Sequence, residues 1–139
     1  MRCAKIIASM MLAVVLMASS CSRKSSDYSL SSDLSAFIDH KIAQNHEGLW
    51  NSSSKRFRDS NDNDAVAYEM YAKSYGVHPV KVDVLGVSES TSSAKIRVKV
   101  NYAGNAGESV GSAVEEWRFV RDKDGWFYDG SRTISESAD

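Results

Sequence analysis

Residues 94–102 read AKIRVKVNY, and this stretch decides the fold because apolar and polar side chains alternate along it. Ala94, Ile96, Val98 and Val100 fall on one side of an extended chain, and charged or amide side chains fall on the other. Such alternation is typical of a β-strand with one face buried. The rest of the chain must therefore supply neighbouring strands and a layer that covers the apolar face.

Three further segments of the sequence have the alternation of strands. They are residues 80–84, residues 113–121 and the aromatic run that begins at residue 126. Polar stretches at 88–93 and 103–112 predict turns, and Asp124-Gly125 predicts a tight turn before the last strand. We therefore predict an antiparallel sheet of about four strands.

Upstream of these strands the apolar period changes to three and four residues, which predicts helices. The first helix carries an apolar stripe, with Ser29, Ser31 or Ser32 as its cap and Gly48 as its end. The stripe is formed by Leu30, Leu34, Phe37, Ile38 and Ile42. A second helix is predicted from Asp62 to Tyr75, because Gly76 and Pro79 follow it. Helices followed by antiparallel strands define the α+β class.

The first 20 residues have the order of a secretory signal peptide. Arg2 and Lys5 precede an apolar run, Ile6–Met17, which is shorter than the roughly 20 residues that a membrane-spanning helix needs. The small residues Ala18-Ser19-Ser20 then lead directly into Cys21. We therefore expect residues 1–20 to be removed on export.

Cys21 and the small residues before it resemble the lipobox of bacterial lipoproteins, although that family prefers leucine where Ala18 stands. The resemblance implies cleavage before Cys21, lipidation of Cys21, and attachment of the mature protein to a membrane. Residues 21–29, polar and rich in serine, then form a short lipidated tether. In an envelope with two membranes, the same resemblance, with Ser22 after the cysteine, implies the inner leaflet of the outer membrane, facing the periplasm.

Cysteine count and charge exclude several functional classes. Only Cys3 and Cys21 are present, so a mature domain with a lipidated Cys21 has neither thiol catalysis nor zinc–thiolate sites. The chain has a net charge of −1, and the absence of a basic excess argues against nucleic acid as a partner. Asp59, Asn61 and Asn63 have calcium-loop spacing but lack the glycine and the bidentate glutamate of such loops. We therefore expect neither a metal nor a cofactor.

Two segments resemble nuclear-transport-factor-2-like (NTF2-like) domains of the cystatin-like superfamily. They are Phe57-Arg58-Asp59 and the aromatic hairpin at residues 116–127, which reads EWRFVRDKDGWF. The resemblance implies a curved sheet wrapped against N-terminal helices, which together form a cone. The resemblance covers most of residues 28–132. We therefore expect one domain at residues 30–132, followed by a disordered tail at residues 133–139. Because this fold serves enzymes, carriers and scaffolds, it does not by itself assign a function.

Two groups of side chains are candidate binding sites. An aromatic group with polar tips suits a mostly apolar pocket inside the cone, although plain core packing explains the same pattern. Its members are Tyr68, Tyr71, Tyr75, Trp117 and Trp126. Lys95, Arg97 and Lys99 suit an acidic partner or lipid headgroups, or form a solvated face neutralised by Asp83, Glu115 or Glu116.

We expect a non-catalytic module that binds an unknown envelope protein or a small apolar ligand, and an open sheet face permits a homodimer. The alternative is an enzyme of the dehydratase, isomerase or cyclase type, with His40 or a tyrosine as its titratable group. An enzyme predicts a buried group with a perturbed pKa beside an open cavity. A binding module predicts a filled cone and an exposed charged or apolar patch.

Overall fold

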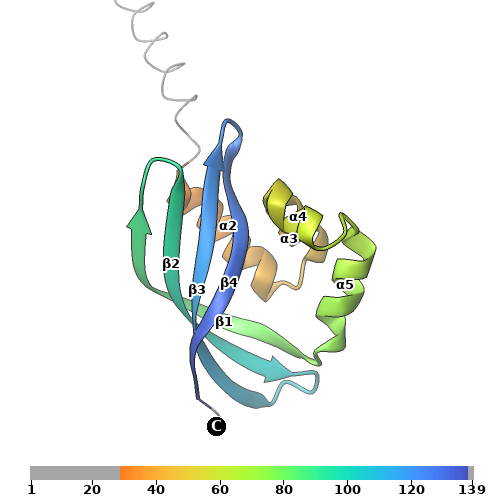
Figure 1. The fold of residues 1–139 in the computed structure, drawn as a ribbon. Helices are drawn as coiled ribbons and strands as arrows, with labels where there is room; N and C mark the ends of the chain where they lie inside the picture. Colours follow the sequence, from red (N-terminus) through yellow and green to blue (C-terminus); the bar gives the residue numbers. More distant parts are fainter. Residues whose placement is uncertain (1–28, 138–139) are drawn as a thin grey trace, which may run out of the picture.

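A computed structural model describes residues 29–137, which form four helices followed by four strands (Figure 1). The helices are α2 (Leu30–Ile42), α3 (His46–Asn51), α4 (Lys55–Ser60) and α5 (Ala65–Ser74). The strands are β1 (Val77–Glu89), β2 (Ser93–Gly104), β3 (Ser109–Asp122) and β4 (Gly125–Ser137). The segments expected to form the signal peptide and most of the tether, residues 1–28, lie outside the described residues.

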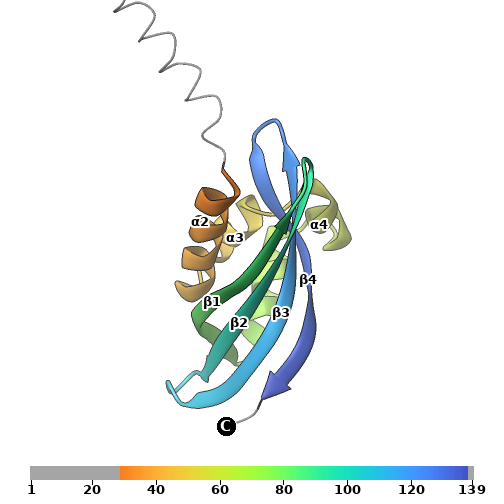
Figure 2. The same ribbon diagram turned by 90° about the vertical axis from the view of Figure 1, so that its left-hand side faces the viewer.

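The strands form one antiparallel sheet in the order β1-β2-β3-β4, so each strand pairs with its neighbour in sequence. The sheet is strongly curved, and α2 lies along one face of it (Figure 2). Register shifts interrupt each pairing, including one between Arg118 and Phe119 of β3. The α+β class, the four strands and the curved sheet over N-terminal helices are therefore confirmed.

Alternation along β2 and β3 builds the core as the sequence predicts. Ile96, Val98 and Val100 are fully buried on the face that points toward the helices, whereas Lys95, Arg97 and Lys99 point away from it. Phe37 of α2 inserts between the aromatic side chains of β3 and β4, and its ring stacks on Tyr128 with centroids 4.6 Å apart. The inner face of the sheet and α2 therefore share one hydrophobic core.

Local capping fixes where the two longer helices begin. The side chain of Ser29 accepts a hydrogen bond from the amide of Ser32 and thereby caps α2. Asp33, in the first turn of α2, accepts a hydrogen bond from the amide of Trp126 at 2.9 Å, which ties this helix to β4. Asp64 caps α5 through the amides of Val66 and Ala67.

The polar segment that precedes α5 is more structured than its composition predicts. Residues 51–64 contain α4, and Ser53 and Ser54 are buried although both are polar. Residues 52–54 lie beside β4, where the Tyr128 amide donates to the Ser52 carbonyl and the Ser54 amide donates to the Tyr128 carbonyl, both at 2.8 Å. These main-chain hydrogen bonds do not depend on apolar side chains, so hydrophobic periodicity does not reveal them.

Two predicted boundaries are wrong. The first helix ends at Ile42 rather than at Gly48, which instead lies inside α3. The last strand continues to Ser137, so residues 133–137 are not a disordered tail but pair with β3 as far as Ser112. Among residues 29–137, no helix has the length and apolar content needed to cross a bilayer.

Candidate functional site

A cluster of polar side chains lies within the core, where the helical layer meets the sheet. We name it the inner cluster; it consists of Lys41 of α2, Tyr102 of β2, and Glu115 and Trp117 of β3. Glu115 is buried and points inward because it lies two residues before Trp117 on the same strand. The expectation that Glu115 neutralises the outward-facing lysines is therefore wrong.

Both carboxylate oxygens of Glu115 are occupied. The Tyr102 hydroxyl donates to one oxygen, and Nε1 of Trp117 donates to the other at 2.7 Å. The Nζ atom of Lys41 lies 5.4 Å from the ring centroid of Trp117 and 5.7 Å from that of Phe37. A carboxylate, a phenol and an amine thus meet on the inner side of the sheet.

Burial changes the acid–base properties of this cluster. Desolvation lowers the pKa of Lys41, because the charged ammonium loses water, and the negative charge of Glu115 opposes this effect in part. Desolvation also raises the pKa of Tyr102, and the hydrogen bond and charge of Glu115 raise it further. Tyr102 also lines an open hollow of about 480 Å³ together with His78 and Asn101. The cluster therefore has the groups of an acid–base site, and one of its residues, Tyr102, also belongs to the lining of this hollow.

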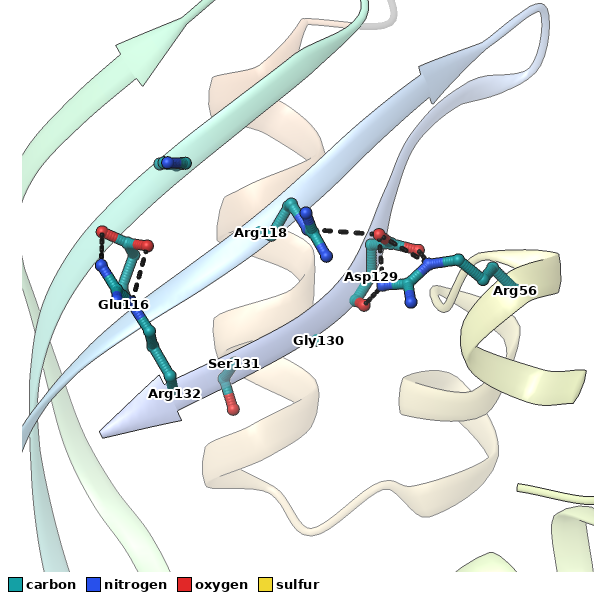
Figure 3. Close-up of a pocket in the computed structure, with 8 residues that line it drawn as sticks. Arg56, Glu116, Arg118, Asp129, Gly130, Ser131 and Arg132 are labelled. Atoms are coloured by element: carbon teal, nitrogen blue, oxygen red, sulfur yellow. Dashed lines mark hydrogen bonds and ion pairs between the residues drawn. The ribbon is translucent and has the colours of Figure 1, made fainter. Parts of the chain in front are cut away.

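A second site lies on the side of the sheet opposite α2, over β3 and β4 (Figure 3). We name it the outer cleft; its volume is about 410 Å³. It is lined by Arg56, Lys95, Glu116, Arg118, Asp129, Gly130, Ser131 and Arg132. Its charged side chains thus come from α4 and from three strands.

Asp129 binds the polar side chains at one end of the outer cleft. Its side chain is 5% exposed and accepts hydrogen bonds from Oγ of Ser54 at 2.5 Å and from Nη2 of Arg56 at 2.7 Å. Nε of Arg118 lies 3.4 Å from the same carboxylate. Burial alone would raise the pKa of Asp129, but the hydrogen bonds and charges of Arg56, Ser54 and Arg118 hold it below its usual value.

The five aromatic residues predicted to line a pocket differ in burial and in position. Trp117 and Trp126 are buried in the core, and Tyr68 is half-buried against Trp50 and Phe57. Tyr71 and Tyr75 lie on α5, where their hydroxyls share a hydrogen bond at 2.5 Å and both side chains are exposed. The structure does not bring the five together around one pocket.

His40 serves the local structure of the helices. Nδ1 of His40 lies 3.2 Å from Nδ2 of Asn45, and the ring packs over Gly48. A Cβ atom at Gly48 would lie 2.5 Å from Nδ1 of His40, so only glycine permits this approach. In residues 29–137, no group of three or more histidine, cysteine, aspartate or glutamate side chains is arranged to hold a metal ion.

Sequence reasoning missed both Lys41 and Asp129 as site residues. Lys41 lies four residues after Phe37, so helical spacing alone places it beside the apolar stripe. Asp129 gives no such signal, because the register shift in the β3–β4 pairing lies beside it and interrupts the alternation there.

Several solved structures have a fold similar to that of this chain. A protein of unknown function with a cystatin-like fold from Nostoc punctiforme is 8% identical, with a TM-score of 0.55, and the match covers 75% of this chain and 86% of that one. An NTF2-like protein of unknown function from Prochlorococcus marinus is 14% identical, with a TM-score of 0.52 and coverage of 79% and 92%. An LEH-like epoxide hydrolase from M. tuberculosis is 8% identical, with a TM-score of 0.50 and coverage of 70% and 74%.

These similarities show that the chain has an α+β fold like that of NTF2-like and cystatin-like proteins. No protein-family model matches the sequence, and a search of curated proteins finds no match. At these identities the similarity shows the fold alone, and the function must be argued from the two sites.

Proposed function

We propose that this chain is a membrane-tethered lipoprotein of the bacterial envelope whose NTF2-like domain acts as a non-catalytic binding module. The observation that carries this proposal is the close aromatic packing between α2 and the inner face of the sheet. Trp117 is fully buried and Phe37 is 1% exposed, and their rings pack edge to face with centroids 5.4 Å apart. Both oxygens of Glu115 also accept hydrogen bonds from Tyr102 and Trp117, so this buried carboxylate has a structural role.

The outer side of the sheet supports a binding role. It carries the outer cleft, whose exposed cations include Lys95 of β2 and Arg132 of β4. A symmetric contact between two such faces would bring like charges together, which favours an acidic partner over a second copy of this chain. Confinement to a membrane would raise the local concentration of the module near such partners without adding contacts.

Lipidation is tested with two cysteine variants. We expect Cys21→Ser to abolish labelling of the protein by a palmitate analogue in cells, because no other residue is the acceptor. Cys3→Ser is the matched control and should remain labelled, since it lies in the segment that is removed. Continued labelling of Cys21→Ser would contradict the lipoprotein assignment.

The binding role is tested by complementing a deletion strain and scoring its sensitivity to detergent. We expect Glu115→Gln to restore growth when the protein level on an immunoblot matches that of the wild type. We expect Lys95→Glu combined with Arg132→Glu, which reverses two exposed charges of the outer cleft, to fail at the same level. The opposite pattern would contradict a non-catalytic role.

The second candidate function is an acid–base enzyme of the dehydratase, isomerase or cyclase type. The observation that favours it is the inner cluster, in which the half-buried Lys41 has a lowered pKa and Tyr102 lines an open hollow. A perturbed group beside a cavity is the pattern of many catalytic sites. In the complementation experiment this function predicts that Glu115→Gln fails and that the outer-cleft variant succeeds.

A further inference from the structure

The outer cleft carries an excess of positive charge. Four cationic side chains and two carboxylates line it, so two positive charges are not balanced within the cleft. The side chains of Arg56, Arg118 and Arg132 are 62%, 52% and 70% exposed, so a ligand in solution can reach their guanidinium groups. An excess of accessible positive charge favours an anionic ligand.

The carboxylates fix the positions of the arginines but use only some of the N–H donors of each guanidinium group. Arg56 uses Nε and Nη2 to bind Asp129, and Arg132 uses the same two nitrogens to bind Glu116. A guanidinium group has five N–H donors, so the donors on Nη1 are not consumed by these contacts. Because Asp129 is buried, it fixes the position of Arg56 before any ligand arrives.

A glycine in the middle of the cleft leaves this part of the floor without a side chain. Gly130 has a φ of 133°, which favours glycine, and a Cβ atom built at this position meets no atom within 4 Å. It pairs with Arg118 of β3 in the register of the sheet, between the Asp129 and Arg132 ends of the cleft. The volume of about 410 Å³ is ample for a small polyatomic anion.

We propose that the outer cleft binds a phosphate group, presented either by a small phosphate monoester or by the headgroup of an anionic phospholipid. A phosphate has several oxygens that accept hydrogen bonds at once, and this suits a cleft lined by cations from α4, β2, β3 and β4. Figure 3 shows Arg56 and Arg118 beside Asp129 at one end of the cleft and Arg132 beside Glu116 at the other. Arginine forks match phosphate geometry better than a single ammonium group does. This inference rests on the proposed binding function and names the chemistry of its ligand.

The test uses the full lipidated chain in phosphatidylcholine nanodiscs, with the amide NMR signals of Gly130 and Ser131 as the readout. In the first arm glycerol 3-phosphate is added, and we expect these two signals to shift to saturation. In the second arm part of the phosphatidylcholine is replaced by phosphatidic acid, without any soluble ligand. A shift of the same signals in the second arm alone assigns the phosphate to the membrane.

Variants that each remove one charge test whether binding depends on the residues that line the cleft. We expect Lys95→Gln and Arg132→Gln each to weaken binding about tenfold, as the loss of one charge-assisted contact does. Both side chains are exposed and leave the buried Asp129 paired, so the fold should be retained. Arg97→Gln is the matched control: it removes a cation from the same face of β2 but does not line the cleft, and binding should change less than twofold.

Two results would overturn the inference. One is that neither glycerol 3-phosphate nor phosphatidic acid shifts the Gly130 and Ser131 signals. The other is that Arg97→Gln weakens binding as much as Lys95→Gln, which would show a diffuse electrostatic effect rather than a site. Either result leaves the proposed binding function standing if the complementation pattern holds, so the two failures can be told apart.

Discussion

Trp117 is the largest side chain in the described domain that is fully buried. Its ring packs against Phe37, and its indole nitrogen donates to Glu115. We expect Trp117→Ala to lower the free energy of unfolding by about 3 to 5 kcal/mol, because the cavity that it leaves cannot close fully. Urea denaturation followed by far-UV circular dichroism measures this loss.

The control for Trp117→Ala is an aromatic residue on the surface. Tyr71 is 61% exposed, so we expect Tyr71→Ala to change the free energy of unfolding by no more than about 0.5 kcal/mol. Equal losses in the two variants would contradict the position of Trp117 in the core.

Lys41 provides a second prediction for a single residue. Burial lowers its pKa from 10.5, and Glu115 partly restores it, so Glu115→Gln should lower the pKa of Lys41 further. A folded-state pKa below the unfolded value means that the ammonium is disfavoured in the fold. This cost is fully present below the folded pKa and disappears as the pH rises from the folded pKa toward 10.5.

The pKa of Lys41 can be followed by NMR after reductive methylation of the lysines with a ¹³C-labelled reagent. We expect the Lys41 signal to titrate below 10.5 in the wild type and lower still in Glu115→Gln. A midpoint that rises in Glu115→Gln would contradict the proximity of the two charges.

At the scale of one element, α5 is a helix with little support from the core of the domain. None of its residues is buried, and Val66, Met70 and Tyr71 are each more than 60% exposed. Asp64→Ala removes its N-cap, so we expect residues 65–74 to lose about 1 kcal/mol of local stability. Hydrogen–deuterium exchange read by mass spectrometry should show faster exchange in that peptide and unchanged exchange in β2.

Asp124→Ala is the matched control for α5. It makes the same substitution in the turn between β3 and β4, far along the chain from the helix. We expect exchange in residues 65–74 to match the wild type. Faster exchange there in Asp124→Ala would show a global loss of stability instead of a lost cap.

Elements with strong periodicity were predictable from the sequence, and those without it were not. The alternation along β2 and β3 and the apolar stripe of α2 predicted the sheet and the helix that covers it. The short helices α3 and α4 carry no such stripe, and Ser54 is buried to bind Asp129, which follows it by 75 positions. A contact over that separation follows from the register of β4, which the sequence pattern does not specify.

For the whole molecule, Asp129 links the helical layer to the sheet. Its folded pKa is lowered from 3.8, so its contribution to stability is fully present above that value and is lost as the pH falls through the folded pKa. We expect Asp129→Asn to lower the free energy of unfolding at pH 7 by about 1.5 to 3 kcal/mol, because the buried side chain loses its charge-assisted hydrogen bonds with Ser54 and Arg56. Below pH 4 the difference between the variant and the wild type should shrink.

Urea denaturation at a series of pH values from 7 to 2.5 checks this prediction for Asp129. Asp83→Asn is the comparison, since Asp83 is 46% exposed and contacts Lys81 only at 3.6 Å. We expect it to follow the wild-type pH profile closely. Parallel profiles for the wild type and Asp129→Asn would contradict a stabilising role for the ionised Asp129 side chain.

Residues 52–54 lie beside the first half of β4, and their position affects how readily the sheet can pair with another copy of the protein. An unprotected strand edge recruits other chains and starts aggregation, and confinement to a lipid surface multiplies the encounters between copies. Here residues 52–54 shield one end of β4, charged Arg132 and Glu136 follow on the same strand, and Pro79 with two register shifts breaks up β1 at the opposite margin. On a lipid surface, where we propose that this molecule is held, the covered end of β4 would oppose edge-to-edge stacking of sheets at that edge.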